Sequence, residues 1–465
     1  MGTSPCSRRR FLRTAGLGAA ALSCAAGTHA ASTRRKPNVV FFLTDDQRLN
    51  TIAALGNPFI HTPNLDKLAQ GGFVFQNAYC MGSMVGAVCL PSRTMILTGT
   101  SLFRAKDAPS GPDREQATWP RAMKEAGYAT LRSGKAGNHP SAVCGEFEQY
   151  IQIRRHTSCT EEHTDNGIMF IRDNAGKKPF FLLLAYGSPH DPQPAPERYH
   201  ALYNTTALWS SLNFEPFHPF DNGEPKNRDE LTLPWPRTPE NVGAKLARYY
   251  ASITYTDEQI GRVLDVLAET GEMENTIVVF ASDNGLSLGD HGLLGKQNLY
   301  EFGGMQVPLV IAGRGVSPGE SNALVYLFDV YPTVMDLAGL HVPSKLEGKS
   351  LKPVIQGKKE RVRESLYCAY KDVQRSIRDD RWKLIRYPKI GRTQLFDLAA
   401  DPYETKDLAG DPVNTGRVRE MMNRLAEAQK QYGDPAPLSV PDPAPGALRL
   451  EDYLKWNSEV DSSTQ

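Results

Sequence analysis

The chain has 465 residues, of which 40% are hydrophobic and 23% charged, a composition typical of a folded globular protein. That length is enough for one large domain and a smaller one. The formal net charge is +1, so no basic field indicates a nucleic-acid partner. After the first 30 residues, nothing approaches the run of about 20 apolar residues that crosses a membrane.

The first 30 residues have the features of an export signal. A basic stretch over 7–13 holds three consecutive arginines, an apolar run follows over 15–26, and small residues suited to cleavage lie at 28–30. This pattern resembles a twin-arginine signal. It predicts export from a bacterial cell, to the periplasm or beyond, through the twin-arginine translocase. The alternative is a basic disordered tail, which the Phe-Leu pair after the arginines disfavours.

Four apolar runs, rich in β-branched and aromatic residues, predict buried parallel strands at 38–44, 128–132, 180–186 and 276–280. Each is followed by polar residues: Asp45 and Asp46, Lys135, His190, and Asp283 with Asn284. Ligands bind at the carboxyl ends of strands in such sheets. Taken alone, the Asp pair fits a solvated turn as well as a cation site. A lone His is more often structural, but the prolines on both sides of His190 favour a functional role.

The remaining helices and strands are predicted from the spacing of apolar residues and from the residues that typically begin and end helices. Helices are expected at 63–71, 119–126, 242–270, 324–338 and 415–432, and a strand at 307–312. The stretch 73–79 is predicted to be extended, and 202–239 to be a long irregular excursion. From about Ser365 the pattern changes to short antiparallel strands, expected at 375–378, 382–387 and 394–398.

The stretch Cys89 to Gly99 places a thiol just before an expected helix. Pro91 suits a first helical turn, and Ser92 and Thr94 are expected to satisfy free amides there. Arg93 next to a thiol at a helix N-terminus predicts a lowered pKa and a reactive cysteine. The alternative is a buried structural cysteine.

These eleven residues resemble, without a gap, the C-x-P-S-R-x-x-x-L-T-G signature of type I sulfatases. Family patterns also match at 63–72, 188–192, 282–285, 288–292 and 295–301, and the resemblance runs from about Pro37 through the small C-terminal region. It implies an alkaline-phosphatase-like α/β fold, in which helices flank a mixed, mostly parallel sheet, with a small C-terminal antiparallel sheet plus helix. The domains expected are catalytic at 36–364 and a small subdomain at 365–435. The tail at 436–465 is expected to lie on the surface or to be disordered.

The resemblance also implies a modified residue and a metal. In that family the cysteine, here Cys89, is oxidised to formylglycine (3-oxoalanine) by a formylglycine-generating enzyme, and the aldehyde is hydrated to a gem-diol. One hydroxyl attacks sulfur and the alcohol leaves; the other hydroxyl then expels sulfate, which regenerates the aldehyde. The implied metal ligands are Asp45, Asp46, residue 89, Asp283 and Asn284. This all-oxygen set favours one calcium ion over zinc.

The remaining implied roles concern substrate binding. Lys135 and Lys296 neutralise sulfate oxygens. Arg93 orients the diol, and His190 binds sulfate and protonates the leaving oxygen. The sequence departs from the family's G-K-W-H pattern, because His139 comes two positions later than expected after Lys135. The resemblance implies that His139 takes the place of that histidine in substrate binding.

The function implied is hydrolysis of sulfate esters, of a sulfated glycan or of a small molecule such as choline sulfate or an aryl sulfate. Two alternatives stay open: a formylglycine-dependent phosphonate or phosphate ester hydrolase, and a non-catalytic glycan-binding relative. A disulfide between Cys144 and Cys159 also stays open at this stage.

Overall fold

The computed structural model describes residues 35–105, 117–153, 159–203 and 212–460. Residues from Lys36 onward form one compact unit. The predicted export signal lies outside the described residues.

Within the described residues, the main sheet has nine strands. Its order is β10 (Gly319–Tyr326), β2 (Phe73–Tyr79), β9 (Leu309–Gly313), β7 (Thr276–Ser282), β1 (Asn38–Thr44), β6 (Phe180–Ala185), β4 (Ala129–Lys135) and β5 (Gln149–Ile153), and β8 (Gln306–Val307) pairs with β2. The run from β7 to β5 is parallel, whereas β9 is antiparallel to both of its neighbours. The sheet is therefore mixed and mostly parallel, as expected.

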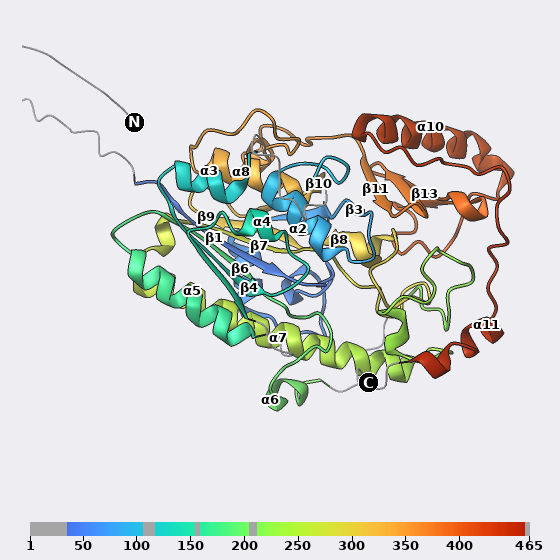
Figure 1. Cartoon of the computed structure of the whole chain (residues 1–465), viewed down its shortest axis with the longest axis horizontal. Coiled ribbons are helices and arrows are strands. Elements are labelled where there is room, and N and C mark those ends of the chain that lie inside the picture. Colours follow the sequence, from blue (N-terminus) through green and yellow to red (C-terminus); the bar gives the residue numbers. More distant parts are fainter. Residues whose placement is uncertain (1–34, 106–116, 154–158, 204–211, 461–465) are drawn as a thin grey trace, which may run out of the picture. The chain divides into compact units, whose positions relative to one another are not determined.

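Helices cover both faces of this sheet, which explains the unbroken apolar runs of its central strands. On one face lie α1 (Pro63–Gly71), α5 (Thr160–Asn174) and α7 (Pro239–Glu269), whose apolar side chains share one core cluster. On the other lie α2 (Cys89–Thr98), α3 (Trp119–Glu125), α4 (Ser141–Cys144) and α8 (Val330–Leu337) (Figure 1). Side chains of β1 alternate between the two sides, so that Phe42 packs with α5 and α7 while Phe41 packs against Trp119 of α3.

The second sheet is small and lies toward the C-terminus. Its order is β14 (Arg392–Asp397), β13 (Trp382–Tyr387), β12 (Gln374–Arg378), β11 (Leu366–Tyr370) and β3 (Gly82–Ser83), and α10 (Thr415–Tyr432) packs on it. Strand β3 comes from the chain just before Cys89, so this sheet is tied to the larger domain. Gly82 has a φ of +112°, and a Cβ there would lie 1.9 Å from Ala369 O. The pairing of β3 with β11 therefore requires glycine.

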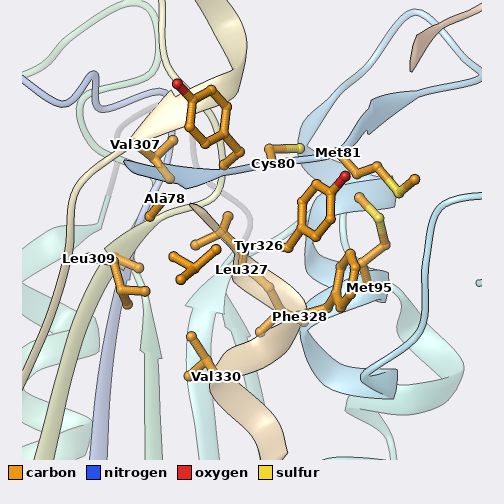
Figure 2. Packing of buried hydrophobic residues seen from close by; sticks show 14 of the residues in the cluster. Ala78, Cys80, Met81, Met95, Val307, Leu309, Tyr326, Leu327, Phe328 and Val330 are labelled. Carbon is orange, nitrogen blue, oxygen red and sulfur yellow. The ribbon is translucent and has the colours of Figure 1, made fainter. Parts of the chain in front are cut away.

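One apolar cluster joins the signature helix to the sheet. Met95 of α2 belongs to the same core as Ala78 of β2 and Leu309 of β9, and the segment from Tyr326 to Val330 contributes to it as well (Figure 2). Because α2 is packed on both the sheet and this segment, the position of Cys89 at its first turn is fixed.

Several elements differ from the expectations. The helix expected over 324–338 begins only at Val330, because Leu324, Val325 and Tyr326 pair with β2 at the end of β10. A continuous apolar run does not distinguish a strand from a buried helix. The sequence analysis did not predict β5 or α5. Three further short helices are α6 (Glu197–His200), α9 (Lys352–Ile355) and α11 (Leu450–Leu454).

Part of the C-terminal tail packs against the rest of the protein. Helix α11 lies in the tail, and its Tyr453 is buried and packs against Trp235. In the part of the chain that the structure describes, no helix is long and apolar enough to cross a membrane.

Candidate active site

Four acidic or thiol side chains meet at the carboxyl end of the sheet. Asp45 and Asp46 follow β1, Asp283 follows β7, and Cys89 begins α2. Strands β1 and β7 are parallel neighbours with Thr44 opposite Ser282, so their following residues come side by side. One ligand atom from each of the four lies within 4.8 Å of the others, and all four residues are fully buried. The structure thus brings together the acidic residues that follow β1 and β7 and the cysteine of the signature.

Three cations balance the three carboxylates. Arg93 bridges two of them, with Nη2 3.0 Å from Asp45 Oδ2 and Nε 2.8 Å from Asp283 Oδ2. Lys296 Nζ lies 2.7 Å from Asp46 Oδ1, and Lys135 Nζ pairs with Asp45 Oδ2. A buried cluster of this kind is stable only when its charges are paired.

The cations do not affect the carboxylates equally. Burial disfavours the charged form of Asp45, but Lys135 and Arg93 outweigh burial and hold its pKa well below the usual value. For Asp283, burial and the neighbouring Asp45 outweigh Arg93 and raise the pKa to about 7. The cluster therefore has room for one further positive charge, which would favour the ionised form of Asp283.

The Cys89 thiol faces the carboxylates. It donates to Asp45 Oδ1 at 3.1 Å, and Lys296 Nζ lies 3.4 Å from the sulfur. Burial, then Asp283 and Asp45, raise the pKa of the thiol well above its usual value. The expectation of a lowered pKa was wrong, because Arg93 is paired with Asp45 and Asp283. An unmodified Cys89 is thus a neutral, weakly nucleophilic thiol.

Two other residues of the signature also behave differently from the expectation. Ser92 Oγ donates to Asp283 O at 2.6 Å, and Thr94 Oγ1 donates to Leu90 O at 2.8 Å. Both hydroxyls therefore satisfy carbonyls rather than free amides. The Ser92 bond ties the first turn of α2 directly to the end of β7.

Asp46 is held in an unusual backbone conformation, with a φ of +69°. Its N–H donates to Asp283 Oδ1 at 3.2 Å. Its carbonyl accepts from the Tyr249 hydroxyl at 2.6 Å, and that hydroxyl accepts from Arg48 N at 2.9 Å. The sequence predicted only the helix that carries Tyr249 and gave no signal of this role.

The two histidines take different places. His190 Nε2 lies 3.7 Å from Asp46 Oδ2, and the side chain is 12% exposed, so it reaches the centre from the accessible side. His139 lies with Tyr150, whose hydroxyl it contacts, and with Ser141, whose Oγ is 3.5 Å from its Nε2. Cys144 is a free buried thiol and is not joined to Cys159.

The irregular excursion supplies residues that the sequence analysis missed. Asp229 Oδ2 accepts from Gln297 Nε2 at 3.0 Å, and Gln297 in turn accepts from Lys296 N. Burial opposes ionisation of Asp229, but Lys296 and Arg228 hold its pKa below the usual value. No motif marks Asp229, because its contact with Gln297 joins residues that are 68 positions apart in the chain.

The donor set fits a hard divalent cation. Three carboxylates converge, and Asn284 Oδ1 is buried with no hydrogen-bond partner among the described residues. A buried amide oxygen that accepts no hydrogen bond is energetically unfavourable, and a bound cation would remove that penalty. Oxygen ligands favour calcium or magnesium over zinc.

The fold and this centre define a member of the sulfatase family. The family model described as Sulfatase matches residues 37–340, and a second, described as "N-sulphoglucosamine sulphohydrolase, C-terminal", matches residues 289–431. The chain belongs to the sulfatase family, and it is a sulfatase enzyme.

Relatives and solved structures agree with this assignment. The chain is 28% identical to the N-acetylglucosamine-6-O-sulfatase of Bacteroides thetaiotaomicron, with 90% of this chain and 91% of the relative covered. A structure solved in complex with its substrate D-glucosamine-2-N,6-O-disulfate matches with a TM-score of 0.74 at 25% identity, covering 87% of this chain and 99% of that one. The phosphonate monoester hydrolase of Agrobacterium radiobacter shares the fold, with a TM-score of 0.70 at 20% identity over 85% of this chain and 96% of that one.

Proposed function

We propose that this enzyme hydrolyses sulfate esters of saccharides, using formylglycine at position 89 and one calcium ion. The observation that carries the proposal is the position of Cys89. Its sulfur lies among Asp45, Asp46, Lys296 and Asn284, yet as a thiol it is neutral and weakly nucleophilic. Conversion of the same side chain to formylglycine explains why the fold places residue 89 at this centre.

The cation would be held by Asp45, Asp46, Asp283, Asn284 and the modified residue 89. When bound, a calcium ion at these ligands would offset the negative charge of a sulfate group. The buried Oδ1 of Asn284 and the raised pKa of Asp283 support this assignment, since both groups gain from a nearby positive charge.

Formylglycine, once hydrated, supplies two hydroxyls on one carbon, one to take the sulfuryl group and one to release sulfate. Lys135 and Lys296 place their ammonium groups at the centre, where they would bind the negatively charged sulfate oxygens. Arg93 keeps Asp45 and Asp283 in place, and its Nη1 is buried with no hydrogen-bond partner among the described residues. That donor is available to orient residue 89.

His190 would protonate the leaving oxygen. Its ring is the partly exposed group of the centre and lies close to Asp46, on the side from which an alcohol leaves. The backbone oxygen of Asp191 lies 2.9 Å from Nδ1, which leaves Nε2 directed at the centre. The role suits histidine, whose pKa ordinarily lies near neutral pH.

A saccharide substrate is supported by the relative named N-acetylglucosamine-6-O-sulfatase and by the solved structure in complex with its substrate, a disulfated glucosamine. The phosphonate hydrolase shares only the fold at its level of identity. The reaction class therefore has to be tested directly.

The test compares sulfate and phosphonate substrates on one preparation. We expect release of sulfate from N-acetylglucosamine 6-O-sulfate at a higher kcat/KM than hydrolysis of a phenylphosphonate monoester. Mass spectrometry of the peptide with residue 89 should show the aldehyde, and Cys89→Ala should abolish turnover while leaving the fold intact. Full activity with an unmodified cysteine would contradict the mechanism, and a preference for phosphonate would contradict the substrate class.

Export is the second part of the proposal. A twin-arginine route carries folded proteins, whereas residue 89 is buried once the domain has folded. Modification should therefore precede folding and transport. A precursor trapped in the cytoplasm by Arg8→Lys and Arg9→Lys should already carry the aldehyde, because lysine keeps the charge but lacks the guanidinium. A folded precursor with a free thiol, next to an exported form with the aldehyde, would contradict this order.

A further inference from the structure

A second cavity lies beside the loop that follows β1. Its volume is about 360 Å³, at the small end of the range of ligand pockets. Five separate segments line it: the loop 48–59, Gln76 of β2, helix α7, the stretch 288–302 and the turn at Tyr403. None of the residues assigned above to the chemistry lines this cavity. Cavities formed where several segments meet are typical of binding sites.

Aromatic rings form much of the wall. Phe302 stacks on Tyr403, with ring centroids 5.1 Å apart and planes 20° from parallel. Phe59 and Tyr403 are each 37% exposed, which is unusual for large apolar side chains in this protein. A flat ring open to solvent offers a face on which the C–H face of a sugar ring can pack.

The cavity carries no unbalanced charge. Arg48 and Asp290 are the charged residues among the described ones that line it, and they pair at 2.6 Å with side chains less than 10% exposed. A sulfate or carboxylate entering here would find no cation free to neutralise it.

Amide side chains contribute polar groups to the wall. Asn50, Asn57 and Gln76 line the cavity. The Asn57 amide is engaged within the wall, because its Nδ2 donates to Asn50 O at 2.6 Å and to the Tyr250 hydroxyl at 3.0 Å, and its Oδ1 accepts from Phe59 N at 2.9 Å. Gln76 Nε2 donates to Glu320 Oε2 at 3.1 Å. The Oδ1 of Asn50 is buried and has no hydrogen-bond partner among the described residues. Amides both donate and accept, as do the hydroxyls of a sugar.

We propose that this cavity binds a neutral, unsulfated pyranose ring. Aromatic faces, amides and a neutralised ion pair match such a ring and do not match a sulfated one. The inference rests on the proposed action on saccharides, because the ring would belong to the same chain as the sulfated residue. The site would hold a longer saccharide at the enzyme without taking part in the chemistry.

The test measures binding by the full chain carrying Cys89→Ala, which separates binding from turnover. The probes are neutral tetrasaccharides of glucose, galactose, mannose and N-acetylglucosamine, followed by NMR line broadening of the sugar. We expect at least one series to bind. Phe59→Ala and Tyr403→Ala should each weaken that binding at least tenfold, while Val413→Ala, at a site 81% exposed elsewhere, should not change it. Inorganic sulfate should not compete.

Three results would overturn the inference. The first is no binding of any of the four probes. The second is binding that neither aromatic substitution weakens. The third is self-association of the chain that Phe59→Ala abolishes, which would assign the cavity to a second copy. In the active enzyme, both substitutions should leave turnover of N-acetylglucosamine 6-O-sulfate unchanged. If the unsubstituted enzyme did not hydrolyse N-acetylglucosamine 6-O-sulfate at all, that result would refute the proposed function but not the binding of neutral sugars at this cavity.

Discussion

Arg93→Met is the substitution that most directly tests how the catalytic centre is held together. The Arg93 side chain is 2% exposed and bridges Asp45 and Asp283. Methionine fills a similar volume but carries no charge, so both carboxylates lose their shared partner. Lys135 still contacts Asp45, whereas no other cation forms an ion pair with Asp283 within the described residues.

The expected cost follows from burial. Breaking a buried ion pair on one side typically costs about 3–5 kcal/mol, because a charge is left without a partner. Asp283 has a pKa of about 7, so near neutral pH it can escape part of that cost by taking up a proton. We therefore expect the free energy of unfolding to fall by about 3 kcal/mol without added metal. Calcium at 100 times its dissociation constant should restore up to about 2.7 kcal/mol.

The assay is urea unfolding followed by tryptophan fluorescence, with and without calcium. The matched control is Arg361→Met, which removes a surface arginine whose side chain is 46% exposed and paired with Glu364. That control should leave the free energy of unfolding nearly unchanged. If Arg93→Met lost no more stability than the control, or if calcium restored nothing, the reading of Arg93 as the bridge between two metal-binding carboxylates would be wrong.

Three further predictions follow from individual contacts. His190→Ala should slow hydrolysis of sugar sulfates far more than that of nitrophenyl sulfate, since nitrophenolate leaves without a proton; equal losses would refute a general-acid role. Tyr249→Phe removes the hydroxyl that links Asp46 O and Arg48 N through two hydrogen bonds of about 1 kcal/mol each. It should weaken calcium binding several-fold in a chelator competition, and an unchanged affinity would count against a positioning role for Tyr249. Burial raises the pKa of Glu404 from 4.5 to about 7, so the folded chain keeps a proton that the unfolded chain loses. Stability should therefore fall by roughly 3 kcal/mol as pH rises from about 4.5 to 7, a decline that Glu404→Gln should lack; parallel curves for the two proteins would contradict it.

The sequence by itself determined the elements whose signals are local. The strand at 38–44 and the helix at 415–432 have the predicted ends, because an unbroken apolar run buries both faces and a regular spacing fixes one helical face. The signature at Cys89 identified the family for the same reason, since its meaning lies in consecutive residues. Carboxylates at strand ends predicted a centre, because parallel neighbours bring their ends to one edge.

The tertiary structure decided which groups face one another. The sequence predicted that Arg93 would lower the pKa of the Cys89 thiol. In the fold, the Arg93 guanidinium is paired with Asp45 and Asp283, and burial together with these carboxylates raises the pKa of Cys89. Tyr249 became a support of Asp46 only because α7 crosses the end of β1. The sugar-binding cavity likewise depends on Phe59 and Tyr403 meeting from opposite ends of the chain. Electrostatic and packing energies depend on distances in space, and these distances exist only once the chain has folded.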